Sequence, residues 1–162
     1  MNRPRRGFTL IELLVVLVIL GIIVAIAITS VFSAIQRAKQ KKSMADMRTL
    51  ALGLETYQID YSHYPPASAF TLPSGLPLPT LLFSSTVTYL TPTYLKTVPL
   101  TDGWDSWFTY STTPSLGDYA IRSNGRDGLP EGAPAWGATT SFDADIIYSN
   151  GAFLQFPYGV QK

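Results

Sequence analysis

The chain begins with a long run of apolar positions that gives way to a helical alternation of apolar and polar positions. From residue 13 to residue 28 every position is apolar or glycine, and only Thr29, Ser30 and Ser33 interrupt the run before Ile35. About 20 apolar residues span a bilayer as one helix. The run therefore predicts a membrane-spanning helix over residues 8–35. A secretory signal peptide fits less well, because its apolar core is only about 7 to 15 residues long.

The helical pattern continues beyond the apolar run. Apolar side chains recur at spacings of three and four residues along one stripe, at Met47, Leu50, Leu54, Tyr57 and Tyr61. This spacing is typical of an amphipathic helix that packs one face on a core. The residue before a proline is disfavoured in the α region, so the sequence Tyr64-Pro65-Pro66 should end the helix. We expect one continuous helix over residues 9–62, with residues 36–62 as its amphipathic continuation.

The remaining residues, 63–162, are enough for one small core. Residues 65–79 are rich in proline and serine and indicate a loop, and residues 81–90 indicate a short helix. Short strands are predicted at residues 107–111 and 119–123. Asn150-Gly151 lies between two alternating runs and suits a type I′ hairpin turn. The expected fold class is α+β, a long N-terminal helix packed on a small antiparallel sheet.

Composition narrows the possible functions. The 162 residues carry 12 Lys+Arg and 11 Asp+Glu, so the net charge of +1 gives no general attraction for nucleic acid. The chain has no cysteine and therefore cannot form a disulfide. Seven of the 12 basic residues lie within residues 1–42, at Arg3, Arg5, Arg6, Arg37, Lys39, Lys41 and Lys42. No hydrolase, zinc-protease or phosphate-loop motif occurs, and the one histidine, His63, lies beside a proline turn. We expect a protein without enzymatic activity.

Glu12 is an acidic residue inside the apolar block, where an isolated charge is unfavourable by about 2.5 to 3.5 kcal/mol. One explanation is a capping box, in which Thr9 and Glu12 satisfy the first amides of the helix. Counting of basic residues leaves the orientation open, because three arginines and the amino terminus precede the span and four Lys/Arg follow it.

The N-terminal motif resembles the class III signal of type IV pilins and type II secretion pseudopilins, and it reads Arg5-Arg6-Gly7-Phe8-Thr9-Leu10-Ile11-Glu12. This resemblance implies that residues 1–7 are a leader peptide, that a prepilin peptidase cuts between Gly7 and Phe8, and that Phe8 is then N-methylated. It also places the amino terminus in the cytoplasm and the head outside. In a filament, Glu12 of one subunit would neutralise the amine of Phe8 on a neighbour, a role compatible with the capping box.

The rest of the chain resembles the major pseudopilin of type II secretion, in the order of its motifs around Tyr64-Pro65-Pro66, Asp102, Ser123 and Asp143-Ala144-Asp145. The resemblance implies a single-pass protein of the bacterial inner membrane, with a periplasmic head, that lies in membrane lipid before it assembles. It then forms a helical homo-oligomeric filament in the periplasm or at the cell surface. Its partners would be other pseudopilins and the inner-membrane assembly platform. The alternative is a type IV pilin for adhesion, motility or DNA uptake, the one case in which nucleic acid would be a partner.

The same resemblance implies a calcium ion in the C-terminal loop, held by Asp127, Asp143 and Asp145. Calcium takes 6 to 8 oxygen ligands from carboxylates, carbonyls and water, and Glu131 is a further candidate. The alternative is that Asp127-Gly128 is an ordinary turn and that Asp145 is a solvated residue at the end of a strand.

Overall fold

One long helix and a small sheet make up most of the chain. The computed structural model describes residues 7–67, 70–71, 77–78, 81–132 and 134–162. Helix α1 (Leu10–Tyr61) matches the predicted helix within one residue at each end. The residue after its last turn, Ser62, has a left-handed φ of 60°, and Tyr64-Pro65 follows. The chain divides into two units, residues 1–35 and residues 36–162.

In the first unit, α1 has no core of its own. Its large apolar side chains are exposed along the whole stretch, from Phe8 to Ile35. This part of α1 is long and apolar enough to cross a membrane. Burial of these side chains must therefore come from lipid or from another protein.

In the second unit, α1 supplies one wall of the core. Met47, Leu50, Leu54 and Tyr57 are buried, as the periodicity predicts, and they pack with side chains of the sheet. Tyr61 is the exception: it stacks on Tyr57 with ring centroids 4.4 Å apart but remains 56% exposed, so the prediction that it joins the core is wrong. It lies in the last turn of α1, beyond the edge of the core.

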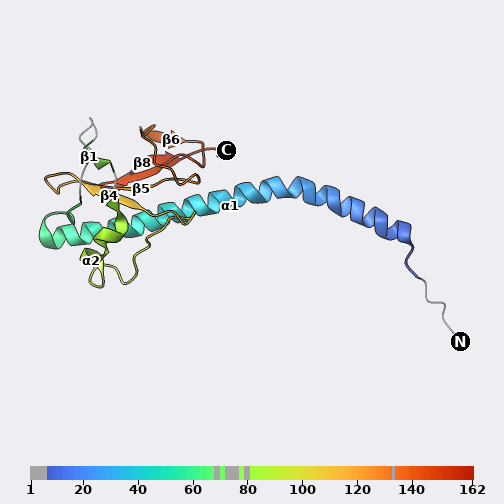
Figure 1. The fold of residues 1–162 in the computed structure, drawn as a ribbon, viewed down its shortest axis with the longest axis horizontal. Coiled ribbons are helices and arrows are strands. Elements are labelled where there is room, and N and C mark those ends of the chain that lie inside the picture. Colours follow the sequence, from blue (N-terminus) through green and yellow to red (C-terminus); the bar gives the residue numbers. More distant parts are fainter. Residues whose placement is uncertain (1–6, 68–69, 72–76, 79–80, 133) are drawn as a thin grey trace. The chain divides into compact units, whose positions relative to one another are not determined.

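The main sheet has six strands in the order β3-β4-β5-β7-β8-β6. Its strands are β3 (Leu81–Leu82), β4 (Thr109–Thr112), β5 (Tyr119–Ser123), β6 (Gly137–Thr139), β7 (Ile146–Ser149) and β8 (Ala152–Pro157). The sheet lies along the second half of α1 (Figure 1). The predicted strand at residues 107–111 begins two residues later than expected, because Trp107 instead forms an isolated bridge with Thr101.

The C-terminal half of the sheet contains a tight hairpin, β7–β8, and one parallel strand pair, β6 with β8. The β7–β8 turn has positive φ at both Asn150 (45°) and Gly151 (86°), as a type I′ turn requires, which confirms the predicted hairpin. Strand β6, however, pairs in parallel with β8, so the expectation of an antiparallel sheet is wrong at this edge and the sheet is mixed. The long connection between β5 and β7 makes this possible, since it returns across the edge of the sheet beside β8.

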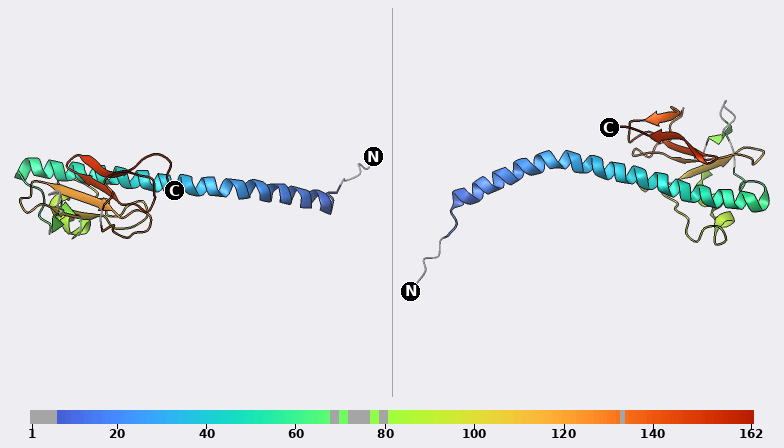
Figure 2. Two further views of the ribbon diagram at one scale, coloured as in Figure 1. Left: turned by 90° about the horizontal axis from the view of Figure 1, so that it is seen from above. Right: turned by 180° about the vertical axis from the view of Figure 1, so that it is seen from behind.

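Part of the segment between α1 and β4, including α2 (Val87–Leu90), lies on the other side of α1 from the sheet (Figures 1 and 2). Strands β1 (Phe70–Thr71) and β2 (Pro77–Leu78) form a two-stranded sheet within the predicted loop at residues 65–79, much of which lies outside the described residues. The predicted helix at 81–90 is present only from Phe83, as a 3₁₀ turn (Phe83–Thr86) followed by α2 (Val87–Leu90). Buried Phe83 and Leu90 attach this segment to the core.

Candidate processing, assembly and metal sites

The predicted cleavage bond lies just before α1. Gly7 and Phe8 are not helical, and Phe8 is 79% exposed. A Cβ built at Gly7 would meet no atom within 4 Å. The bond between Gly7 and Phe8 is therefore sterically accessible, as a protease site requires. Residues 1–6 of the predicted leader lie outside the described residues.

Glu12 forms the predicted capping box with Thr9. The amide of Thr9 donates to Glu12 Oε2 at 2.9 Å, and the Thr9 hydroxyl donates to the same oxygen at 2.8 Å. In return, the amide of Glu12 donates to Thr9 Oγ1 at 3.3 Å. These contacts satisfy amides that a helix N-terminus leaves without partners. They keep the carboxylate in the first turn of the helix, four residues from the proposed new N-terminal residue, Phe8. The pairing of Glu12 with a neighbour's amine stays a prediction.

The three predicted metal ligands have different surroundings. Asp143 is occupied by Arg126, whose Nε and Nη2 donate to its two carboxylate oxygens at 2.7 Å each. This bidentate pair lowers the pKa of Asp143. Asp127 is exposed, and its Oδ1 accepts a hydrogen bond from the amide of Leu129 at 3.0 Å, which is an ordinary Asx turn.

Asp145 is buried at the start of β7. Its Oδ2 accepts from the amide of Glu131 at 3.0 Å, and the guanidinium of Arg122 lies 3.8 Å away. Burial raises the pKa of Asp145 to about 6, although the Glu131 amide and Arg122 oppose the rise. The alternative, in which Asp145 is a solvated residue at the end of a strand, is therefore wrong.

Two buried oxygen atoms in this region lack donors. Among the described residues, Asp145 Oδ1 and Asn124 Oδ1 are buried without a hydrogen-bond partner. Ser123 pairs with Ile146 in the β5–β7 ladder, so Asn124 and Asp145 follow and precede these paired residues on adjacent strands. Orphaned buried acceptors are unfavourable unless water or a cation satisfies them.

The structure thus brings together only part of the predicted calcium set. Within the part of the chain that the structure describes, no three acidic or histidine side chains are grouped to hold a metal ion. The orphaned oxygens of Asn124 and Asp145 suit a hard cation, and the negative charge of Asp127 acts on Asp145. Asp143 does not fit, because Arg126 already binds both of its oxygens.

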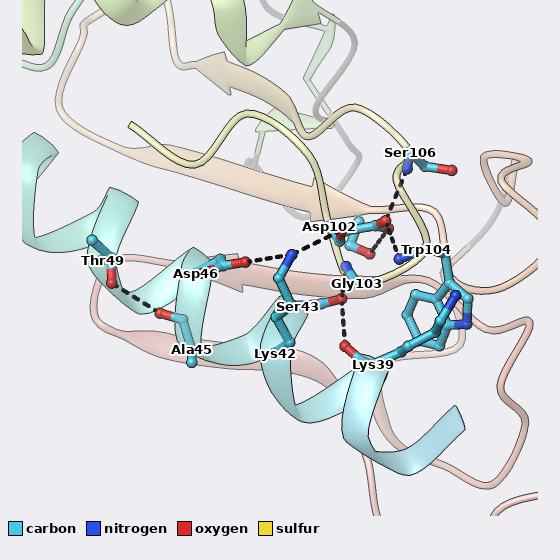
Figure 3. A network of polar contacts seen from close by, with 11 residues as sticks. Lys39, Lys42, Ser43, Ala45, Asp46, Thr49, Asp102, Gly103, Trp104 and Ser106 are labelled. Carbon is cyan, nitrogen blue, oxygen red and sulfur yellow. Dashed lines mark hydrogen bonds and ion pairs between the residues drawn. The ribbon is translucent and has the colours of Figure 1, made fainter. Parts of the chain in front are cut away.

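Asp102, for which the sequence predicts no role, organises the contact between a loop and α1 (Figure 3). Buried Asp102 Oδ1 accepts from the amides of Trp104 and Ser106 at 2.8 and 3.0 Å, and its Oδ2 accepts from Ser123 Oγ at 2.6 Å. The adjacent Gly103 amide donates to Ser43 Oγ on α1 at 2.9 Å. The dipeptide Asp102-Gly103 is a turn signal that could have indicated the loop, but the partners on α1 and β5 are distant in sequence.

Gly103 is required by this close approach. A Cβ there would overlap the main-chain carbonyl of Lys39 on α1, which cannot move without disturbing the helix. The loop also attaches through Trp104 Nε1, which donates to Gln36 Oε1 at 2.6 Å. The loop at residues 102–106 thus attaches the head to residues 36–43 of α1, the first two turns of the helix within the second unit.

Comparison with known proteins gives two family matches that adjoin along the chain. Residues 2–28 match the prokaryotic N-terminal methylation motif, and residues 30–141 match protein G of the type II secretion system. Three similar proteins are type II secretion system core protein G from Pseudomonas aeruginosa, Escherichia coli K12 and Klebsiella pneumoniae. They are 32%, 31% and 30% identical over 82%, 76% and 78% of this chain and over 91%, 83% and 89% of their own lengths.

Proposed function

This chain belongs to the type II secretion system protein G family and is a pseudopilin subunit, and we propose that it is stored in the inner membrane and then built into a helical filament. The observation that carries the proposal is the direct succession of the methylation motif and the protein G profile. The exposed apolar half of α1 supports it, because that half requires burial by lipid first and by neighbouring subunits afterwards.

Processing would begin at the accessible bond between Gly7 and Phe8. A prepilin peptidase would remove residues 1–7 and methylate the new amine of Phe8. The amino terminus would face the cytoplasm and residues 36–162 the periplasm. The basic leader and the apolar stretch after it support this arrangement, although the count of basic residues alone does not require it.

Assembly would then transfer the first half of α1 from lipid to an equally apolar environment. The hydrophobic effect contributes little free energy to such a transfer, because both environments are apolar. Charge pairing and close packing of the helices must therefore stabilise the filament. Glu12 would accept the amine of a neighbour's Phe8, so that neither charge remains alone in the filament core. The capping box keeps the Glu12 carboxylate at the helix N-terminus before the neighbour arrives.

The family favours protein secretion over the pilus alternative. The relatives are named as core components of type II secretion. Other pseudopilins and the inner-membrane assembly platform would then be the partners of this chain, together with the prepilin peptidase. Its role would be structural, as a repeated unit of the filament.

We also propose a calcium ion in the loop between β5 and β7, with a ligand set different from the one expected. Asp145 Oδ1 and Asn124 Oδ1 would supply buried ligands, and Asp127 an outer carboxylate. The ion would replace the missing donors and offset the repulsion between the two aspartates. Asp143 would instead keep its pair with Arg126 and close the loop from outside.

The proposed function is tested by processing. The full chain, made together with a prepilin peptidase, should lose residues 1–7 and gain one methyl group on Phe8, which intact-mass analysis measures. The control is the same chain made without the peptidase, which should keep its leader. Recovery of uncut chain in the presence of the enzyme, or a cut near Ala27, would contradict the proposal.

A further inference from the structure

A small hollow lies between the basic part of α1 and the C-terminal segment. Its volume is about 230 Å³, below the roughly 300 to 1,000 Å³ of sites for drug-sized ligands, so a small chemical group would suit it. Four residues of α1 and four of the C-terminal segment line it: Arg37, Gln40, Lys41, Met44, Pro157, Tyr158, Gly159 and Gln161.

A buried amide pair holds the two sides of the hollow together. Gln40 and Gln161 are 4% and 7% exposed, and Gln40 Nε2 donates to Gln161 Oε1 at 3.3 Å. Gln161 Nε2 in turn donates to the carbonyls of Thr139 and Tyr158 at 2.8 and 2.9 Å. The C-terminal segment is thus fixed against α1, and the hollow is a built feature of the fold.

The two cations of the hollow have no carboxylate partner within the described residues. Among the described residues, ion pairs join Lys42 to Asp46, Arg122 to Asp145 and Arg126 to Asp143. Neither Arg37 nor Lys41 takes part in an ion pair with another described residue. Two cationic side chains without partners on one hollow favour an anionic occupant.

The position of the hollow along the chain indicates where the anion comes from. Arg37 and Lys41 follow Ile35, the last residue of the apolar stretch, by two and six residues. Tyr158, which lines the same hollow, is 71% exposed. An exposed tyrosine next to Lys or Arg at the end of an apolar span is typical of the membrane interface, where basic side chains attract anionic lipids.

We propose that this hollow binds the headgroup of an anionic phospholipid of the phosphatidylglycerol type while the subunit is stored in the membrane. Arg37 and Lys41 contact the phosphate, and Met44 and Tyr158 cover the glycerol and the root of the acyl chain. This proposal rests on the membrane anchoring in the proposed function. It also explains why four basic residues follow the span, on the side where the positive-inside rule does not favour them.

The test is titration of the processed full chain, in neutral detergent, with short-chain phosphatidylglycerol or phosphatidylcholine, with bound lipid counted by native mass spectrometry. Phosphatidylglycerol should bind preferentially. Each cation near an anionic surface contributes about fivefold in affinity. The double variant Arg37→Gln/Lys41→Gln should therefore lose about thirtyfold, whereas the charge-matched double variant Lys39→Gln/Lys96→Gln should lose less than about twofold.

Several outcomes would overturn the proposal. Equal binding of the two lipids, or an equal loss in the two double variants, would mean diffuse attraction and no site. Displacement of phosphatidylglycerol by an equal concentration of inorganic phosphate would assign the hollow to a free anion. Cross-linking of Lys41 to an acidic residue of a second copy, without lipid preference, would assign it to assembly. Membrane anchoring is measured separately, by insertion into nanodiscs, and its failure would count against the proposed function instead.

Discussion

The two halves of α1 belong to one unbroken helix but obtain their burial from different sources. In the first half the large apolar side chains from Phe8 to Ile35 are exposed, and they cover the helix on all sides. In the second half a single stripe, Met47 to Tyr57, is buried against the chain's own sheet. A helix that is apolar all round needs lipid or other helices, whereas an amphipathic one needs only a core on one side. The same secondary structure therefore depends on other molecules for burial in one half and on the chain's own head in the other.

The largest expected effect concerns Glu12, in the half that depends on other molecules. Glu12→Ala should abolish filament formation when it is the only subunit, because a neighbour's amine would then be buried without a partner. Membrane insertion should be unchanged or improved, since a carboxylate is removed from the apolar block. Electron microscopy of sheared filaments, with membrane fractionation of the same cells, measures both effects.

Glu12→Gln is the matched control, because it keeps a side-chain acceptor for Thr9 but removes the charge. If charge pairing matters, this variant should also fail to assemble. Normal filaments from Glu12→Gln would leave the capping box as the main role of this residue.

The second prediction concerns the half that folds with its own head. Leu54→Ala should lower the free energy of unfolding of the head by about 2 to 5 kcal/mol, because it leaves a cavity in a fully buried site. Leu52→Ala, at a position 63% exposed, should change it by less than about 0.5 kcal/mol. Urea unfolding of the full chain in detergent, followed by tryptophan fluorescence, reports on the head alone, because all 3 tryptophans lie there.

Leu17→Ala extends this comparison to the first half. It should leave the unfolding midpoint of the head unchanged, since Leu17 lies in the separate unit. A clear shift of the midpoint would mean that the first half of α1 contributes to the stability of the head, and it would contradict the separation of the two halves.

The features that the sequence predicts are those that depend on neighbouring residues along the chain. Both halves of α1, β5 and the β7–β8 hairpin follow from local periodicity and turn chemistry, and α1 and β5 lie within one residue of their expected bounds. The parallel pairing of β6 with β8 could not be predicted, because it joins segments with no local signal for each other. The bidentate pair of Arg126 with Asp143 was missed for the same reason, and it removes one expected calcium ligand.

The third prediction concerns calcium, which should stabilise the head and leave the first half unaffected. At a hundredfold excess over Kd, Ca²⁺ should raise the free energy of unfolding by about 2.7 kcal/mol. Mg²⁺ should substitute poorly, because it is smaller and demands octahedral geometry. Thermal melting of the full chain with Ca²⁺, with Mg²⁺ and with a chelator measures the effect.

Variants separate the revised calcium ligands from the expected ones. Asp145→Asn should remove the response to Ca²⁺, whereas Asp143→Asn should keep it and lose at most about 1 kcal/mol in either condition, as an exposed ion pair does. Identical melting of the wild-type chain with Ca²⁺ and with chelator would mean that hydrogen bonds and turns alone hold the loop.

The smallest expected effect concerns the loop at residues 102–106, which attaches the head to α1. Gly103→Ala should lower the free energy of unfolding by about 1 to 3 kcal/mol, because the new methyl group overlaps the carbonyl of Lys39. Gly117→Ala is the matched control, since a Cβ there meets nothing closer than 3.6 Å. Equal unfolding midpoints for the two variants would show that the loop moves freely away from α1.

The central claim, that the first half of α1 is buried by neighbouring subunits, is tested most directly by an electron cryomicroscopy reconstruction of the filament. The account predicts the apolar stretch of every subunit in the filament interior and the Glu12 carboxylate about 2.7 to 2.9 Å from the Phe8 amine of a neighbour. A filament in which these helices face solvent or lipid, or in which Glu12 contacts only its own Thr9, would contradict it.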